Sequence, residues 1–551
     1  MQRELVETDV LCVGGGIVGL MAAIRASELG SKVVVAEKSN TLRSGAAATG
    51  NDHFLCYIPE IHGTDLTGLM ESVMGSQVRE RFRFLGKGMA RTFFERSFEI
   101  VKLWDSWGIP MKYGGKYEFA GHTFPGHPFI RLKYSGKDQK PILTKEAAKR
   151  GVQIINRVMV FELLRDNNGS IAGALGLSTR EEKLVEFRAK SVILGTGTVT
   201  RLYPGLSPGW MGNLSRPGTV TGDGRAMAYR SGAELGDLEM PGHHAGPKYF
   251  CRSGQGTWVG VLRDPQGNPV GPFLTEPDRK YSDIIIEVNK RLFLDYAKSG
   301  KGPVYMDCTG ISDQDHDYMM HWLEHEGCSA FVNHLREEGI DLRKNPVEFT
   351  TYGYRSGGGR IWQNERCETS VKGLYATGDE TVGGISPAAI FGWMAGENAA
   401  HHAKDVLPSM MVEATAKIEE WERLFSEIRS REVGPDWKEV NIALQQIMND
   451  YAGVIRSETL LAAGITLLQR LKKKAYATMI AKNQHELIRC LEVLNLLDLG
   501  ELMFISMRER KETRGQHVRS DYPFTNPLLN MWLVIKKAEG NPVTEWREFR
   551  R

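Results

Sequence analysis

The chain has 551 residues, which is too long for one ordinary domain, so we expect two or three domains that together bury a large core. Charged residues make up 25% of the chain and the formal net charge is only +3, which excludes a disordered chain and gives no strong field to recruit nucleic acid. The first nine residues lack the apolar core of a secretory signal, and no segment approaches the roughly 20 apolar residues of a membrane span. We therefore expect a cytoplasmic protein without direct membrane insertion.

The spacing of the cysteines argues against a metal or cluster site within this chain. The seven cysteines are scattered, and none of them forms a C-x-x-C pair. We therefore predict no metal ligands here, and any iron–sulfur cluster that the protein uses must lie on another chain.

Residues 9–38 begin with the pattern of a dinucleotide-binding βαβ unit. A short apolar run, Val10–Val13, predicts a buried strand. Gly14, Gly16 and Gly19 follow at the G-x-G-x-x-G spacing, which lets the backbone approach a pyrophosphate at a helix N-terminus. The glycines alone are a weak signal, because a tight turn in another α/β protein has the same spacing.

The rest of this segment strengthens the prediction. Apolar residues at helical spacing over Leu20–Leu29 predict a helix, and Lys32–Ala36 predicts a second buried strand that ends at Glu37. The carboxylate of Glu37 stands where it can accept hydrogen bonds from ribose hydroxyls. Strand, glycines, helix, strand and acid together predict a dinucleotide whose adenosine ribose carries no 2′-phosphate.

Three later segments are rich in small residues and far apart in the chain, as expected for a large cofactor pocket. Ala189–Gly197 predicts an apolar strand that ends in small residues, and Thr221–Gly224 opens a predicted helix. Lys372–Glu380 predicts a strand followed by glycines and a small-residue helix, whose positive end would stabilise negative charge on the cofactor. The candidate cofactor-binding residues of the whole chain are Gly14, Gly16, Gly19, Glu37, Lys38, Ser44, Gly45, Gly50, Gly195, Thr196, Gly197, Asp223, Gly378, Asp379 and Ser386.

The middle and the end of the chain have different patterns. Residues 237–354 are richer in turns and histidines, and from about residue 401 the periodicity is mainly helical. We therefore predict an α/β fold, with a Rossmann-type cofactor-binding domain formed by residues 1–236 and 355–406. An α+β capping domain is inserted in it at residues 237–354, and a helical domain follows at residues 407–551.

The order of these segments resembles the flavoprotein subunits of the succinate dehydrogenase, fumarate reductase, L-aspartate oxidase and adenylylsulfate reductase superfamily. The resemblance extends over nearly the whole chain. It is carried by GGGIVG at 14–19, RSGAAATG at 43–50, TGDG at 221–224, GDLEM at 236–240, KGLYATGD at 372–379 and RGQHVRSDYP at 514–523. The resemblance implies that the Rossmann-type domain binds FAD. It also implies a mobile cap over the isalloxazine ring and hydride or two-electron chemistry at flavin N5.

Departures from the superfamily bear on the linkage of the cofactor and on the substrate. The membrane-bound succinate and fumarate enzymes bond the flavin covalently through a histidine in this first turn, whereas Gly45 stands here, so we expect noncovalent FAD. Ser282 and Ile390 stand where the resemblance places an arginine proton donor and an arginine that clamps a carboxylate. Uncharged side chains cannot supply the charge of a guanidinium, so fumarate and succinate are disfavoured as substrates.

Two stretches are more similar to the α subunit of adenylylsulfate reductase, namely KYFCRSGQGTWVG at 248–260 and GYRSGGGRIW at 353–362. The substrate residues of that enzyme are not matched. Arg355 stands in place of a histidine, Phe250 or a neighbour in place of an arginine, and the position of an asparagine falls near Leu55. We therefore expect a relative of that enzyme with a changed substrate pocket.

Three residues are our candidates for catalysis. Arg355 precedes a run of glycines, so its permanent charge would bind an anionic substrate or stabilise a reduced flavin, unless it is a surface arginine on a loop. His244 aligns with a substrate-contacting histidine of the fumarate-type enzymes, although backbone hydrogen bonds in the cap would also explain it. His53 follows the turn on the flavin side and would suit a capping cluster equally well. The candidate substrate-binding residues are His243, Arg252, Trp258 and Asn51.

Together these features predict an FAD-dependent oxidoreductase subunit that resembles adenylylsulfate reductase α and acts on a small, anionic substrate. The resemblance implies an oligomer in which electrons pass to or from a ferredoxin-like iron–sulfur subunit. One alternative is a fumarate- or aspartate-type dehydrogenase with relocated arginines. Another is an electron-transfer module that holds FAD without a substrate of its own. A substrate chamber beside the flavin would distinguish an enzyme from such a module.

Overall fold

The computed structural model describes most of the chain. It covers residues 1–75, 86–121, 123, 126–205, 216–248, 256–257, 261–270, 276–281, 283–284, 295–296, 298–356, 359–407 and 414–548. Within these ranges, no helix is long and apolar enough to cross a membrane.

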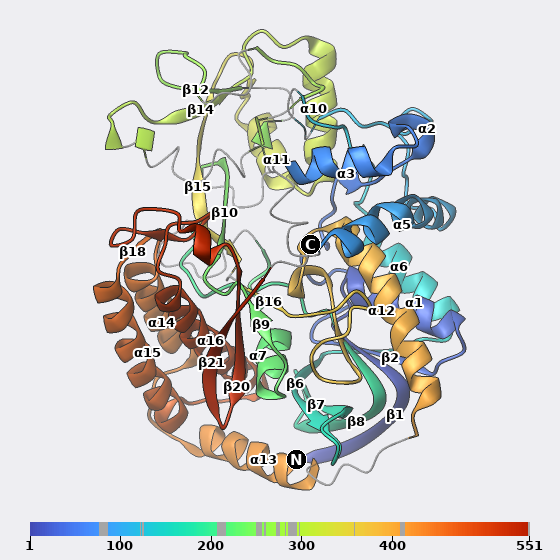
Figure 1. Ribbon diagram of the computed structural model, residues 1–551, viewed down its shortest axis with the longest axis vertical. Helices are drawn as coiled ribbons and strands as arrows, with labels where there is room; N and C mark the ends of the chain where they lie inside the picture. The colour runs from blue at the N-terminus through green and yellow to red at the C-terminus, as the bar shows by residue number, and fades with distance from the viewer. Residues whose placement is uncertain are drawn as a thin grey trace.

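A seven-stranded sheet forms the base of the molecule and confirms the predicted α/β fold (Figure 1). Its strand order is β5-β2-β1-β8-β7-β6, with β17 also paired to β8. The parallel strands are β1 (Gln2–Val13), β2 (Val33–Glu37), β5 (Gln153–Asn156), β8 (Lys183–Leu194) and β17 (Leu374–Ala376). The antiparallel strands are β6 (Val158–Arg165) and β7 (Ile171–Ser178).

Successive side chains of β1 belong to two different hydrophobic cores, one on each face of this sheet. Val10 and Cys12 belong to the core that also contains α1 (Ile17–Glu28) and α12 (Ile385–Asp405). Leu11 and Val13 belong to a second core on the opposite face. Successive side chains of a strand point to opposite faces, so a strand buried on both faces has a continuous apolar sequence.

Several helices and short strands surround the sheet on its helical face and connect it to the cap. They are β3 (His53–Leu55), β4 (Arg131–Lys133), α2 (Pro59–His62), α3 (Leu66–Gly75), α5 (Gly86–Ser106) and α6 (Gln139–Lys149). On the other face, α7 (Asp223–Arg230) begins at the TGDG turn, as the sequence predicts.

The inserted cap has a hydrophobic core of its own. Its sheet has the order β10-β15-β14-β12, formed by β10 (Gly242–Pro247), β15 (Val347–Ser356), β14 (Val304–Asp307) and β12 (Val261–Arg263). The described part of the cap also contains β11 (Gly256–Thr257), β13 (Asp283–Ile284), α10 (Asp313–His325) and α11 (Ser329–Glu337).

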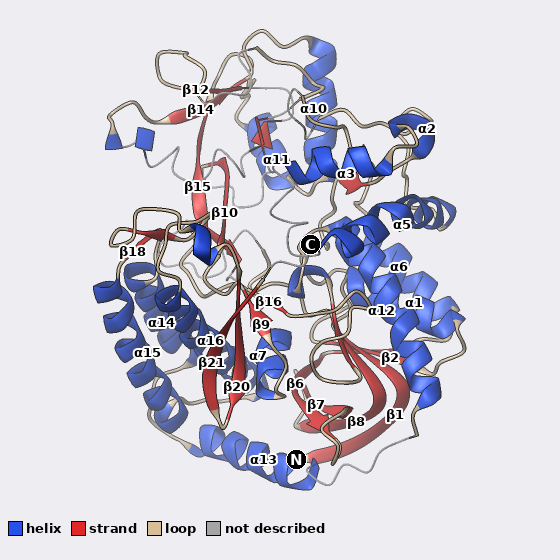
Figure 2. Cartoon of the chain, in the orientation of Figure 1, coloured by secondary structure: helices blue, strands red, loops and turns tan. Residues whose placement is uncertain are grey.

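The C-terminal region contains the predicted helices but ends differently (Figure 2). The helices are α13 (Ala414–Ser430), α14 (Trp437–Tyr451), α15 (Glu458–Thr478) and α16 (Gln484–Glu509). The prediction of a helical end is wrong after α16, because β20 (Trp532–Ala538) and β21 (Asn541–Arg547) form a hairpin. Glu539 and Gly540 both have positive φ, which suits a tight hairpin turn.

This hairpin joins the C-terminus to the rest of the molecule. The order of its sheet is β16-β9-β20-β21, where β9 is Leu235–Gly236 and β16 is Arg360–Ile361. The remaining short elements are η1 (Gly378–Glu380), β18 (Ile455–Arg456), β19 (Val518–Arg519) and η2 (Pro527–Leu529).

Candidate functional site

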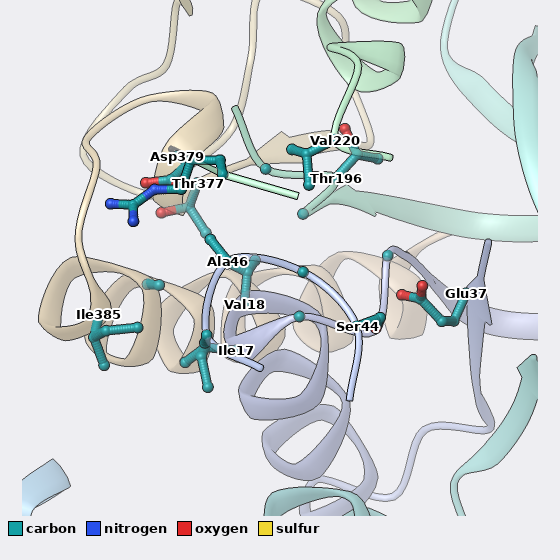
Figure 3. A pocket seen from close by; sticks show the side chains of 18 of the residues that line it. Ile17, Val18, Glu37, Ser44, Ala46, Thr196, Val220, Thr377, Asp379 and Ile385 are labelled. Carbon is teal, nitrogen blue, oxygen red and sulfur yellow. The ribbon is translucent and has the colours of Figure 1, made fainter. Parts of the chain in front are cut away.

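A cavity lies at the carboxyl edge of the parallel strands, beside the N-termini of α1 and α12 (Figure 3). Gly16 and Ile17 line it from α1, and residues 384–388 line it from α12. No side chain caps either helix at its N-cap residue, which is Gly16 in α1 and Gly384 in α12. Helix N-termini without caps present amide groups and a positive dipole end, so both are suited to bind anionic parts of a ligand.

Glycines bring these two helices together. A Cβ built on Gly396 would lie 2.3 Å from the carbonyl oxygen of Ala22, and one built on Gly392 would lie 2.9 Å from that of Val18. Side chains at these positions would therefore separate α12 from α1. The close contact places both N-termini at one cavity.

The predicted glycine turn combines two kinds of glycine. Gly16 lines the cavity, and a Cβ there would approach only the carbonyl oxygen of Gly195, at 3.6 Å. Gly19 does not line the cavity, and its Cβ would lie 1.9 Å from the carbonyl oxygen of Gly14. Gly16 thus leaves room for a ligand, whereas Gly19 allows α1 to pack against the turn.

Glu37 lies at the end of β2, is 7% exposed and lines the cavity. Its Oε2 accepts a hydrogen bond from the amide of Gly15 at 2.7 Å, and its Oε1 accepts one from the amide of Ser39 at 2.7 Å. A carboxylate has about four acceptor sites, so capacity remains for ribose hydroxyls. The ammonium of Lys140 donates to the carbonyl oxygen of Gly15; burial lowers the pKa of Lys140 to about 8, although Glu37 opposes the shift.

Lys38 and Asp223 line the cavity as part of a buried ionic cluster. The Nζ of Lys38 lies 2.7 Å from Asp223 and 2.8 Å from Glu492, and Arg201 lies 2.9 Å from Glu492. Burial alone would lower the pKa of Lys38, but Asp223 and Glu492 raise it above its usual value. Burial would raise the pKa of Glu492, but Lys38 and Arg201 lower it to about 2. The cluster stays charged and holds β2, α7 and α16 together.

A second buried cluster supports Thr196 and Asp379, which both line the cavity. The hydroxyl of Thr196 donates to Glu380, and Arg225 donates to the carbonyl oxygen of Asp379. Oδ1 of Asp379 accepts from the amide of Gly384 at 3.1 Å, at the start of α12. Burial raises the pKa of Glu380 to about 7, although Arg225 opposes the shift.

Polar residues that follow the glycine turn at residues 43–50, and one residue of the cap, also line the cavity. Asn51 and His53 lie there beside Leu55, whose amide donates to the Oγ of Ser386 at 2.6 Å, so β3 adjoins the N-terminus of α12. Glu326, which follows α10, lines the cavity from the cap. A Cβ on Gly50 would lie 2.4 Å from the carbonyl oxygen of His325, so the cap touches this turn. The cavity therefore extends under the cap.

These features fit the FAD that the resemblance implies. The Oγ of Ser44 is buried and has no hydrogen-bond partner among the described residues. Gly45 has a φ of 75°, and no atom lies within 4 Å of a Cβ built on it. Glu37 would hold the ribose, the N-terminus of α1 the pyrophosphate and the N-terminus of α12 the ring.

Two predicted cofactor-binding residues do not line the cavity, and these are Gly19 and Gly378. A Cβ on Gly378 would lie 2.4 Å from Cγ2 of Val18, so this glycine, like Gly19, serves packing. The other predicted cofactor-binding residues line the cavity, together with Asn51 and His53. Their contacts with FAD stay a prediction.

Several predicted substrate residues cannot be placed at the cavity. Arg252 and Trp258 lie outside the described residues, as does Ser282. Arg355 is on β15, and His243 and His244 are on β10, but the structure does not describe their side chains. The backbones are adjacent, since β10 and β15 pair with His244 opposite Tyr352. Their catalytic and binding roles therefore stay predictions.

The structure adds site residues that sequence reasoning missed. Glu326 lies in the cap, far in sequence from the other lining residues. The Nζ of Lys133 donates to Asp52, which is the neighbour of His53 in the chain. The sequence offers one signal for Asp52, an acid next to a histidine after a glycine turn, but nothing local identifies the lysine or the second acid. Lys140 lies in no recognisable motif, and Glu380 ends the segment 372–380, in which sequence reasoning assigned this acid no role of its own.

Comparisons with known proteins agree with this architecture. Residues 9–390 match the family described as FAD binding domain, and residues 441–548 match the family described as fumarate reductase flavoprotein C-term. The chain is 26% identical to one subunit of the fumarate reductase (CoM/CoB) of Methanothermobacter marburgensis, over 98% of each chain. It is 23% identical to L-aspartate oxidase of Vibrio cholerae, over 94% of this chain and 96% of that one.

The structure of adenylylsulfate reductase from Archaeoglobus fulgidus has the same fold, with a TM-score of 0.86 at 24% identity over 100% of this chain and 97% of that one. The family match covers more than half of the chain and includes the whole cavity. The protein therefore belongs to the FAD binding domain family and is an FAD-dependent oxidoreductase.

Proposed function

We propose that this chain is the flavoprotein subunit of a complex that oxidises or reduces a small, anionic substrate next to the FAD ring. When bound, FAD supplies two-electron chemistry, as acceptor or donor of a hydride. The observation that carries this proposal is the continuity of one cavity from Glu37 to His53, Asn51 and the cap residue Glu326. A module that only relays electrons has no need of such a titratable chamber.

The anionic character of the substrate rests on cations expected around this chamber. Arg216 lines the cavity among the described residues. Arg355 lies on β15, which pairs with β10. Guanidinium groups bind carboxylate, sulfate and phosphate groups through forked hydrogen bonds. Arg216 and Arg355 are therefore the groups that support an anionic substrate, although the described lining also contains the acids Glu37, Asp223, Glu326 and Asp379.

We further propose that electrons are exchanged with a separate ferredoxin-like iron–sulfur subunit. The relative from M. marburgensis is named as a subunit, which supports an assembly. The described cysteines are buried, and none of them lines the cavity. A cluster that receives electrons from FAD would therefore be held by a partner chain.

A dicarboxylate or amino acid substrate is the second candidate, because the names of the relatives include fumarate reductase and L-aspartate oxidase. One observation opposes it. Ile390, at the position of the carboxylate-clamping arginine, is fully buried in the core and does not line the cavity. An arginine from another position would have to replace it.

Anaerobic flavin spectroscopy tests these candidates. The purified holoprotein is reduced chemically, and flavin absorbance is followed after addition of adenylylsulfate, fumarate or buffer alone. Rapid reoxidation by adenylylsulfate supports sulfur chemistry, and rapid reoxidation by fumarate supports the second candidate. A flavin that reacts with neither of them, nor with a wider panel of small anions, would contradict a substrate site in this chain.

We also propose that the FAD is noncovalent, because Gly45 offers no side chain to form a bond. Acid precipitation is expected to release all of the flavin into the supernatant. Flavin absorbance that stays with the denatured chain would contradict this.

A further inference from the structure

An ordered chain of polar side chains leads from the protein interior to the cavity. The Nδ1 of His53 lies 2.7 Å from Oδ1 of Asp52, and Oδ2 of Asp52 lies 2.6 Å from the Nζ of Lys133. Asp52 and Lys133 are fully buried, whereas the side chain of His53 is 11% exposed and lines the cavity. The chain therefore runs from the protein interior to the ligand space.

The ion pair determines which nitrogen of His53 carries the proton. A carboxylate paired with an ammonium is ionised, and an ionised carboxylate only accepts hydrogen bonds. Nδ1 of His53 must therefore donate to Asp52, which leaves Nε2, on the opposite edge of the ring, as the basic atom. Burial lowers the pKa of His53, although Asp52 opposes the shift, and this direction favours the neutral imidazole.

Lys133 has a fixed place behind this pair. It belongs to β4, which pairs with β3 so that His53 lies opposite Lys133. Its ammonium also lies 5.0 Å from the centre of the Trp322 ring of the cap helix α10. Burial lowers the pKa of Lys133, and Asp52 opposes the shift. The sheet register and the cap thus hold the lysine against Asp52.

A second acid lies close to the same group. One ligand atom each of Asp52, His53 and Glu326 lie within 4.8 Å of one another, an arrangement also found in metal sites. The ammonium of Lys133 already supplies the positive charge at Asp52, which disfavours a divalent cation there. Among the described residues, the other charged or titratable groups around His53, Asp52 and Lys133 are Arg131, Glu118, Tyr134, Tyr318, His321, His325 and Glu326.

We propose that His53 is the base that exchanges a proton with the substrate, and that Asp52 and Lys133 are positioning residues that hold its imidazole in the Nδ1–H form. The proposal rests on the proposed function for the presence of a substrate, but the state of the imidazole does not depend on which substrate it is.

The proton balance follows from two-electron oxidation. The hydride that leaves a substrate carries both electrons, so the second hydrogen leaves as a proton and bonds to Nε2 of His53. The imidazolium that forms is stabilised by Asp52 and then releases the proton to solvent. In the direction of reduction, the neutral imidazole takes a proton from solvent, and the imidazolium that forms gives this proton to the substrate.

The first test needs no substrate. The holoprotein is labelled with 15N-histidine, and long-range proton–nitrogen correlation spectra are recorded near pH 7.5, with His53→Gln used to assign the His53 signals. We expect Nδ1 to be protonated and Nε2 to be unprotonated in the wild type. We expect this preference for the Nδ1–H tautomer to be lost in Asp52→Asn. A wild-type His53 that is protonated at Nε2 or doubly protonated would overturn the proposal.

The second test uses kinetics with whichever acceptor reoxidises the flavin in the screen described above. His53→Gln is expected to slow reoxidation by about 10²- to 10⁴-fold while FAD stays bound. Asp52→Asn is expected to slow it and to move the pH profile to lower pH, because Lys133 then faces His53 without the compensating charge. His485→Gln, an exposed histidine at the start of α16, is the matched control and should react like wild type.

Two results would overturn this inference without touching the proposed function. One is wild-type kinetics in His53→Gln with an acceptor that reoxidises the wild-type flavin. The other is stoichiometric Zn²⁺ that copurifies with the holoprotein, inhibits turnover and is lost in Glu326→Gln. This result would mean that the group binds a metal ion and does not act as a base that exchanges protons.

Discussion

At the residue scale, the cavity depends on acids whose surroundings give them different roles. Glu37 accepts two backbone hydrogen bonds at the end of β2, so its carboxylate is held in place at the cavity. Glu380 lies behind the cavity and is fully buried, and its carboxylate accepts a hydrogen bond from the hydroxyl of Thr196. The first acid is therefore a candidate ligand of the ribose, whereas the second acts through its neighbours.

Changing Glu37 to Gln should weaken FAD binding by about 1–2 kcal/mol, because the amide group replaces one acceptor oxygen with a donor. The apparent Kd is measured by adding FAD to the apoprotein and following flavin fluorescence. Glu7→Gln on the exposed part of β1 is the control and should bind FAD like wild type. Equal affinity of the wild type and Glu37→Gln would remove Glu37 from the ribose site.

Glu380 should make stability depend on pH. Burial raises its pKa in the folded protein to about 7, above the ordinary value of 4.5. The folded state therefore binds the proton more tightly than the unfolded state does. This contribution to stability is complete below about pH 4.5 and is lost as the pH rises to about 7.

Glu380→Gln mimics the protonated acid, so its stability advantage over wild type should grow from pH 5 to pH 8, by about 1–3 kcal/mol. Denaturant unfolding of both proteins at several pH values measures this difference, with Glu419→Gln on the exposed side of α13 as the control. A difference between Glu380→Gln and wild type that does not change with pH would contradict the raised pKa.

At the element scale, the contact between α1 and α12 positions the two N-termini that line the cavity. Gly392 and Gly396 allow this contact, since side chains there would collide with the backbone of α1. The seven-stranded sheet supports the contact from below, because Val10 and Cys12 of β1 belong to the same core as both helices. The position of the helix ends is thus a consequence of packing along their whole length.

Gly396→Ala should separate these helices, because its Cβ would lie 2.3 Å from the carbonyl oxygen of Ala22. We expect a loss of stability of about 1–3 kcal/mol together with weaker FAD retention. Denaturant midpoints and the ratio of bound flavin to protein are the measurements. His401→Ala, at an exposed position of α12, should change neither quantity. Full stability and full flavin content in Gly396→Ala would show that the helices can move apart without cost.

At the scale of the whole molecule, a buried ion pair joins the C-terminal region to the segment between β9 and β10. Arg510 follows α16 and lies 2.8 Å from Glu239 and 2.8 Å from Glu512. Arg456 donates to the carbonyl oxygen of Glu239 at 2.9 Å. Glu239 follows β9, which pairs with the C-terminal hairpin, so the connection combines charges with strand pairing.

Arg510→Met should destabilise the protein by about 3–5 kcal/mol, because Glu239 and Glu512 would keep their charges in a buried site without this partner. Arg508→Met is the matched control. Its ion pair with Glu458 is about half exposed, with side-chain exposures of 45% and 46%, so a loss below about 1 kcal/mol is expected. Thermal unfolding and flavin release would be recorded together. Similar losses in both variants would contradict a structural role of the buried pair.

Local patterns were sufficient to predict the α/β class, the βαβ unit and the glycine turns, and most of the predicted cofactor-binding residues line the cavity. Each of these rests on contacts between near neighbours in the chain, where alternation, helical spacing and glycine reveal the geometry. The C-terminal hairpin was missed because the helical periodicity that precedes it was extended to the end of the chain, although the turn at Glu539 and Gly540 carries a local signal.

The tertiary structure decided what the local patterns could not. Lys133 reaches Asp52 through the pairing of β3 with β4, and Glu326 reaches the same cavity from the cap. Likewise, Glu380 is far in sequence from Thr196 and Arg225, and burial among them determines its pKa. Burial and the charges of distant neighbours set the state of a titratable group, and neither quantity is encoded in the residues beside it. The amino-acid sequence alone therefore determined which turns line the cavity, whereas the folded arrangement determined which groups stand ready to move a proton there.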